Sequence, residues 1–310
     1  MKFIKTIPMA ICSLALAFAA LGNLLLPLPN GTAIRYICGI ISLGLLIIFS
    51  LKVLLDSPHA KEELKTPVPF SVLPTATMSI MLLSTYIRPH LPGVALIIWY
   101  AALITQICIM GLFFKKFLPD FKLATVFPSW FIVGVGIVAA SVTAPAMGAV
   151  FIGQIAFGVG FILYFAVLPL VVLRMNKVRV FPEPARKTVA IFTAPMSLLT
   201  VGYFSSFVSQ GMVNPAFVYI MLVIASISYI YVSYMMLSLL KIKFYPTYSG
   251  FTFPYVISAT AARLGANFLA SRYGLYFLIT IADIMMWIAL AVVIFVSVHY
   301  IKYFRFWLRF

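Results

Sequence analysis

Ten long stretches of apolar residues follow one another along this chain, separated only by short polar connections. A helix needs about 20 mostly apolar residues to cross a membrane, and each stretch reaches roughly that length. The pattern therefore predicts ten transmembrane helices. Their approximate ranges are Ile4–Leu26, Ala33–Leu55, Pro67–Ile87, Gly93–Phe114, Thr125–Met147, Ala149–Leu173, Thr188–Gln210, Asn214–Leu240, Tyr248–Leu269 and Gly274–Tyr300.

Composition supports an all-α membrane protein. Of the residues, 64% are hydrophobic and only 9% are charged, whereas soluble proteins carry about 25% charged residues. The connections leave no room for a soluble domain, so residues 1–310 are expected to form a single transmembrane domain. The start Met1–Lys5 resembles a signal peptide, but because further apolar stretches follow, we expect the first helix to be retained.

Prolines recur at similar places in alternate stretches. Proline in a helix interior removes one hydrogen bond and bends the axis, at a cost of about 3 kcal/mol, and inside a membrane such a break persists where protein or a cavity surrounds it. The spacing of about 60 residues matches a pair of helices, as in transporters built from repeats. Chance is the alternative, because membrane helices are rich in proline generally. The prolines are Pro8, Pro74, Pro128, Pro195 and Pro254.

The repeat predicts five helical hairpins with pseudo-five-fold symmetry around a central pore. Stretches one, three, five, seven and nine contain many small residues, such as Gly134 and Ser141, which let helix backbones approach closely. The intervening stretches are bulkier, as in Ile40–Ile48. We therefore expect the odd helices to form an inner ring and the even helices to form an outer one.

The net charge of +16 is explained by topology. If the N-terminus is cytoplasmic, four of the 22 basic residues fall on the far side and the other 18 on the cytoplasmic side. Short loops rich in Lys and Arg stay in the cytoplasm, so both termini are expected inside a cell inner (plasma) membrane. The charge then does not indicate a nucleic-acid partner. The four exceptions are Arg35, Arg88, Arg263 and Arg272.

Residues for catalysis or metal binding do not cluster in the sequence. The cysteines lie inside predicted helices, where they suit packing, and the histidines lie in loops or at a helix end without metal-binding spacing. Intramembrane catalysis needs paired carboxylates, a Ser–His arrangement or a metal cluster. We therefore expect neither an enzyme nor a protein with a metal or cofactor. The residues concerned are Cys12, Cys38, Cys108, His59, His90 and His299.

The sequence resembles the tellurite-resistance/dicarboxylate transporter family, which includes the bacterial tellurite-resistance membrane protein and plant guard-cell slow anion channels. The resemblance implies ten helices in five hairpins around a central pore, and a homotrimer whose protomers conduct independently. The matching segments are Pro67–Ser71 with Leu73–Pro74, Phe127–Ser129, Ala194–Pro195 after Arg186–Lys187, and Phe251–Pro254 followed by Ser258–Ala261.

A phenylalanine before the proline of the ninth helix plugs the pore in that family, and this pattern falls on Phe253 and Pro254. The residues that precede the five prolines are all apolar. If symmetry brings them to one level, they form a hydrophobic constriction that gates by excluding water. Thr252 and Thr260 are further candidates for the pore lining, together with the five prolines. The predicted constriction consists of Ile7, Leu73, Phe127, Ala194 and Phe253.

Two charged residues, Arg263 and Asp283, are expected at membrane depth. Arg263 lies nine residues before Arg272 in the last turn, and Asp283 lies eleven residues after it. Two antiparallel helices would then place them at similar depth. Because unpaired charges are costly there, the two residues could form an ion pair, or Arg263 could face the pore and bind anions.

Together these features predict a channel or transporter for small anions of the chloride or nitrate type, with a passage in each protomer gated by Phe253. A proton-coupled C4-dicarboxylate carrier is one alternative, in which Arg263 and Asp283 would supply the basic and titratable groups. A tellurite or oxyanion exporter of the same family is another. The expected partners are small anions, the lipid bilayer and two further copies of the chain.

Overall fold

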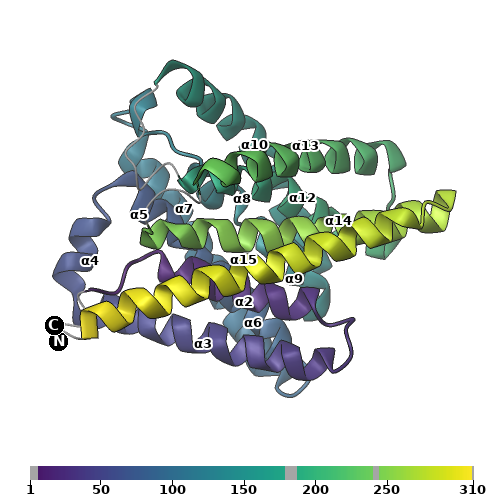
Figure 1. The fold of residues 1–310 in the computed structure, drawn as a ribbon, viewed down its shortest axis with the longest axis horizontal. Helices are drawn as coiled ribbons and strands as arrows, with labels where there is room; N and C mark the ends of the chain where they lie inside the picture. Colours follow the sequence, from purple (N-terminus) through teal and green to yellow (C-terminus); the bar gives the residue numbers. More distant parts are fainter. Residues whose placement is uncertain (1–5, 179–186, 240–243, 309–310) are drawn as a thin grey trace.

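The computed structural model describes residues 6–178, 187–239 and 244–308, and every regular element in these ranges is helical. Helices α14 and α15 lie side by side and antiparallel (Figure 1). The longer helices are α2 (Ile11–Leu24), α3 (Gly31–Leu55), α6 (Pro74–Ile87), α7 (Pro92–Phe117), α9 (Val138–Met147), α10 (Val150–Lys177), α12 (Ala194–Ser206), α13 (Pro215–Leu239), α14 (Thr252–Tyr273) and α15 (Phe277–Leu308). The shorter ones are α4 (Ser57–Glu63), α5 (Pro67–Val72), α8 (Trp130–Val135), and the 3-10 segments η1 (Leu123–Thr125), η2 (Lys187–Thr193), η3 (Val208–Gln210) and η4 (Pro246–Phe251).

Eight described helical spans are long and apolar enough to cross a membrane, where ten were expected. The expected stretch Ile4–Leu26 contains α2, which has only 14 residues because it begins after Pro8. The expected stretch Tyr248–Leu269 overlaps α14, which extends to Tyr273 and is 22 residues long but less apolar than α12 and α6. By length and hydropathy, this is therefore a multi-pass, all-helical membrane protein with eight evident spans.

Buried and exposed spans alternate along the chain. In the spans formed by α5–α6, α8–α9 and η2–α12, 72–78% of the most apolar window is buried. In α3, α7, α10, α13 and α15 the buried share is only 28–33%. This alternation follows the division between stretches rich in small residues and stretches rich in bulky ones, because small residues allow close packing.

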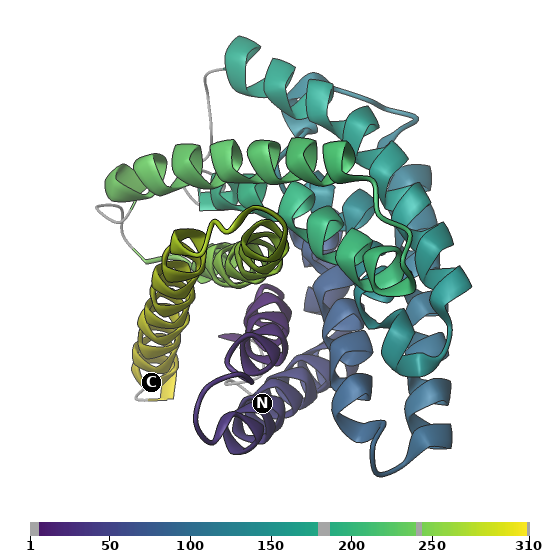
Figure 2. The ribbon, with the colours of Figure 1, turned by 90° about the vertical axis from the view of Figure 1, so that its right-hand side faces the viewer.

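The buried helices contact one another in a closed cycle. Helix α2 packs on α6, α6 on α9, α9 on α12, α12 on α14, and α14 returns to α2. Each exposed helix packs on the buried helix that precedes it in the chain: α3 on α2, α7 on α6, α10 on α9, α13 on α12, and α15 on α14. Figure 2 shows α2 and α14 next to each other, with α3 and α15 outside them.

The recurring prolines lie at the starts of the buried helices, whereas the sequence suggested kinks within them. Pro74 is the first residue of α6, Pro195 the second of α12 and Pro254 the third of α14. Helices α8 and α2 begin two and three residues after Pro128 and Pro8. The first residues of a helix have no intrahelical partner for their N–H groups, so proline costs little there. Short segments α5, η2 and η4 precede α6, α12 and α14.

Hydroxyl groups join neighbouring buried helices. Such hydrogen bonds between membrane helices contribute about 0.6–2 kcal/mol each. They connect the helices at most steps of the closed cycle, so the ring is held by polar contacts as well as by packing. The pairs are Ser13 with Thr75 (3.3 Å), Ser71 with Ser129 (2.6 Å), Ser141 with Ser206 (3.1 Å), Ser197 with Ser258 (3.0 Å), and the Ser249 hydroxyl with the Ala10 carbonyl (2.8 Å).

Lys52, at the end of α3, is fully buried beside two carboxylates. Its ammonium lies 2.8 Å from Asp56 and 3.2 Å from Glu63. Asp56 also contacts His59 Nδ1 at 2.8 Å. The hydrogen bond from Lys52 is the main cause that lowers the pKa of Asp56 below its usual 3.8. This cluster fixes α4 against the end of α3.

Val138 of α9 is packed between two glycines on neighbouring helices. A Cβ at Gly160 of α10 would overlap Val138 Cγ2, and a Cβ at Gly202 of α12 would lie 2.6 Å from Cγ1. We therefore expect Gly160→Ala to lower stability by about 1–3 kcal/mol through overpacking. Thermal unfolding in detergent measures this change.

Gly158, on the same helix, is the matched control, because a Cβ there would meet no atom within 4 Å. Gly158→Ala should keep or raise stability, since alanine favours helix by up to about 1 kcal/mol over glycine. Equal melting temperatures for the two variants would contradict the close packing of α9 against α10.

The lowered pKa of Asp56 predicts a pH-dependent contribution to stability. A carboxyl whose pKa falls on folding stabilises the protein above its unfolded pKa of about 3.8, and this contribution is lost as pH falls through the folded value. Wild type should therefore melt higher than Asp56→Asn at pH 6, and the difference should shrink progressively below about pH 4. A difference that does not depend on pH would show that the ionised form contributes nothing.

Candidate functional site

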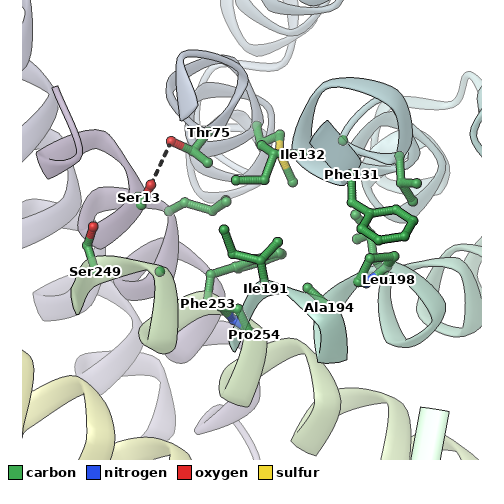
Figure 3. Close-up of a pocket in the computed structure, with 16 residues that line it drawn as sticks. Ser13, Thr75, Phe131, Ile132, Ile191, Ala194, Leu198, Ser249, Phe253 and Pro254 are labelled. Carbon is green, nitrogen blue, oxygen red and sulfur yellow. Dashed lines mark hydrogen bonds between the residues drawn. The ribbon is translucent and has the colours of Figure 1, made fainter. Parts of the chain in front are cut away.

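Two small cavities lie inside the ring of buried helices. The first, of about 40 Å³, is the proline-side cavity (Figure 3), and the second, of about 50 Å³, is the far cavity. The proline-side cavity is lined by Ser13, Leu16, Thr75, Met78, Phe131, Ile132, Val135, Gly136, Ile191, Ala194, Pro195, Leu198, Ser249, Gly250, Phe253 and Pro254. The far cavity is lined by Leu16, Ala20, Asn23, Met78, Leu82, Ala139, Val142, Leu198, Val201, Phe253, Ile257 and Thr260.

Four apolar residues line both cavities and therefore lie between them. They are Leu16 of α2, Met78 of α6, Leu198 of α12 and Phe253 of α14. We call these four residues the apolar layer. Phe253 is the largest of them and is only 8% exposed. The apolar layer separates the two cavities, and its side chains carry no hydrogen-bond donor.

Hydrogen bonds at the start of α14 hold Phe253 in position. The Thr252 hydroxyl donates to the carbonyl of Ser249 at 2.6 Å, which joins α14 to η4. The Thr193 hydroxyl donates to the carbonyl of Pro254 at 3.3 Å, which joins α14 to the residue before α12. These two contacts restrict the backbone on both sides of Phe253. Its aromatic side chain therefore points toward the centre of the closed cycle of buried helices.

The predicted pore residues divide into two groups. Ala194, Pro195, Phe253 and Pro254 line the proline-side cavity, and Thr260 lines the far cavity. The others line neither cavity, and a pore-lining role for them stays a prediction. They are Ile7, Leu73, Phe127, Pro8, Pro74, Pro128 and Thr252.

The distance along the chain from each proline explains this division. Phe253 precedes its proline, but Leu198 and Met78 follow theirs by three and four residues, and Leu16 follows Pro8 by eight. Residues at equal distances along the chain from the five prolines therefore do not lie at the same height in the ring of buried helices. Met78 and Leu198 lie one helical turn after a proline, so helical periodicity was the available signal for them.

The cavity surroundings favour an anion over a cation. Among the described residues that line the cavities, none is acidic, and the hydroxyls of Ser13 and Ser249 are hydrogen bonded to neighbouring helices. Helices α6, α12 and α14 begin beside the proline-side cavity. The start of a helix carries a partial positive charge. Several hydroxyls of the buried helices join one helix to another, as in the pairs Ser141–Ser206 and Ser197–Ser258.

Arg263 of α14 and Asp283 of α15 form an ion pair. Their side chains are 21% and 40% exposed, and Arg263 lines neither cavity. The Arg263 Nε atom is buried and has no hydrogen-bond partner among the described residues. The pair therefore connects the last two helices, and a direct role of Arg263 in anion binding stays a prediction.

A double-mutant comparison separates the two roles of this pair. Arg263→Gln or Asp283→Asn alone should leave one charge unpaired at membrane depth and lower stability by about 3 kcal/mol. The double neutral variant should recover part of that loss. Thermal unfolding in detergent, with anion flux after reconstitution, measures both properties.

If Arg263 binds the transported anion instead, Arg263→Gln should keep its stability and lose flux. Equal stability and equal flux in all three variants would contradict both roles.

Comparison with known proteins assigns this chain to a family. No curated protein matches the chain. The family model described as voltage-dependent anion channel (SLAC1) matches residues 4–301, nearly the whole chain. Members of this family are channels or transporters, and no group of His, Cys, Asp or Glu within the described ranges could hold a metal ion. The chain therefore belongs to the voltage-dependent anion channel family, also known as the tellurite-resistance family.

Proposed function

We propose that this protein conducts small inorganic anions, of the chloride or nitrate type, through the ring of buried helices, and that Phe253 closes the passage at rest. The observation that carries the proposal is the position of Phe253 between the two cavities. The two cavities are the remaining open parts of a passage that the apolar layer interrupts. A hydrated anion that crosses this layer loses water without a replacement, so conduction is low.

The proposed architecture is a ten-helix bundle of five hairpins with pseudo-five-fold symmetry around this passage. The closed cycle of α2, α6, α9, α12 and α14, each with its exposed partner, supports it. Helices α2 and α14 complete the ten. Both are largely enclosed by other helices, so neither needs the length or hydropathy of a helix that faces lipid.

Short buried helices supply the attraction for anions. Helix α2 has 14 residues and is about 20 Å long, and helices α6 and α12 start part-way along spans of 21 and 23 residues, after α5 and η2. Since the hydrocarbon core is about 30 Å thick, these helices begin or end within it. Their starts at the proline-side cavity place partial positive charge inside the membrane, where charge is weakly screened.

The alternatives are less well supported by the cavities. A C4-dicarboxylate carrier needs basic groups for two carboxylates, and no described residue that lines either cavity is basic. Cavities of about 40 and 50 Å³ also suit small anions better. An oxyanion exporter of the same family keeps the same passage. We include in the proposal a homotrimer in the inner membrane with both termini in the cytoplasm, in line with the basic residues of the predicted cytoplasmic loops.

Removing the ring of Phe253 should open the passage. In a reconstituted bilayer, Phe253→Ala should raise the chloride current per protein at least about tenfold, because water can then fill the apolar layer. Phe253→Leu should give a smaller increase, since leucine still occupies part of the space. The current recorded at equal protein density measures the change.

Phe151→Ala is the control, since Phe151 is 73% exposed on α10 and lines neither cavity. Phe251, two residues before Phe253, does not serve as a control because it is 2% exposed and packs against Tyr248. A folded Phe253→Ala protein that conducts no more than wild type contradicts the plug. Concentrative malate uptake without any chloride current would instead favour the carrier.

A further inference from the structure

Arg35 of α3 is held by neutral acceptors on two other helices. Its Nε donates to Asn23 Oδ1 of α2 at 2.9 Å. Its Nη2 donates to the carbonyl and the hydroxyl of Thr85 in α6, at 3.2 and 3.3 Å. The guanidinium also lies over the Tyr86 ring, 4.2 Å from its centroid. These contacts fix the guanidinium in one place between three helices.

This arrangement determines which way the Asn23 amide faces. A guanidinium nitrogen can only donate, so the atom that it contacts is the amide oxygen of Asn23. The amide nitrogen then points away from Arg35. Asn23 lines the far cavity, and its amide nitrogen has no hydrogen-bond partner among the described residues. Asn23 therefore lines this cavity and carries two N–H donors that are not used by another described residue.

The positive charge of Arg35 is not neutralised by a neighbouring acid. None of the ion pairs within the described ranges includes Arg35. Its acceptors are an amide, a hydroxyl and a backbone carbonyl. A positive charge beside a narrow, largely apolar cavity raises the local concentration of anions. It also polarises the Asn23 amide, so that its N–H groups become stronger donors.

We propose that Asn23 is an anion-binding residue of the far cavity, and that Arg35 is its positioning residue. The ligand is a small inorganic monovalent anion, such as chloride or nitrate, that accepts hydrogen bonds from the Asn23 N–H groups and feels the charge of Arg35. The assignment rests on the proposed channel function for its role in conduction. It adds a site on the side of Phe253 opposite the proline-side cavity.

The first test measures current in the open background Phe253→Ala. Adding Asn23→Asp replaces the donors by acceptors and a negative charge, while Arg35 keeps an acceptor that holds the fold. Chloride current should fall about tenfold or more, since a hydrogen bond to a charged group contributes enough for such a change. Asn23→Leu should also reduce it. Arg35→Gln should lower it further than Arg35→Lys, because lysine keeps the charge.

Asn214→Asp is the matched control. Asn214 is exposed before α13, and its side chain accepts a hydrogen bond from the Phe217 N–H. Aspartate can make the same bond, so this variant adds one negative charge away from the cavity and should keep its current. If Asn214→Asp loses as much current as Asn23→Asp, a general surface-charge effect explains the loss and the site is wrong.

The second test measures binding without conduction. Sodium nitrate should raise the melting temperature of the otherwise wild-type protein in detergent relative to sodium gluconate, whose anion is too large for the cavity. Asn23→Asp and Asn23→Leu should abolish this shift while melting normally in gluconate. A shift that persists in both variants overturns the assignment.

The two tests separate the site from the channel function. If Phe253→Ala does not conduct but the nitrate shift depends on Asn23, the plug proposal fails and the anion site stands. If Phe253→Ala conducts and the Asn23 variants change neither current nor the nitrate shift, the plug stands and the anion site is wrong. Should Asn23→Asp not fold, Asn23→Leu and Arg35→Gln supply the same comparison.

Discussion

The need to satisfy backbone polar groups inside the membrane underlies the whole arrangement. Where a buried helix starts at membrane depth, its first N–H groups lack partners, and hydrocarbon supplies none. The chain places prolines such as Pro74 and Pro195 there, which removes one N–H group. Carbonyls of the preceding short segments accept others, as Leu73 does from the Ala76 N–H and Ser249 from the Thr252 N–H. Helices with such starts must be enclosed by protein, so a second layer faces the lipid.

The closed ring and the apolar layer follow from that enclosure. Contacts such as Ser141 with Ser206 and Ser197 with Ser258 fix each buried helix to the next. These hydroxyls then point to neighbouring helices, and the bulky apolar side chains of Leu16, Met78, Leu198 and Phe253 lie between the two cavities. In the proposed channel, polar groups therefore build the wall, apolar groups close the passage, and the helix starts supply the attraction for anions.

Much of the architecture could be predicted from the sequence, because the alternation of small and bulky stretches reports directly which helices are buried. The doublet Phe253–Pro254 also pointed to residues that line a cavity. The rest of the site depends on how far each helix is shifted along its axis. Leu16 and Met78 reach the level of Phe253 from different offsets, and Arg35 meets Asn23 through the turn between α2 and α3. Spacing along the chain records neither shift nor rotation of one helix against another.

The two cavities also have a consequence for volume. Each has space for only a few water molecules, and small cavities with mostly apolar walls tend to stay dry. A dry passage keeps empty space that a wetted passage fills with solvent, so the protein and its water together occupy less volume when the passage is wet. Hydrostatic pressure favours the state of smaller volume. In the proposed channel, compression therefore favours the wetted, open state of the apolar layer.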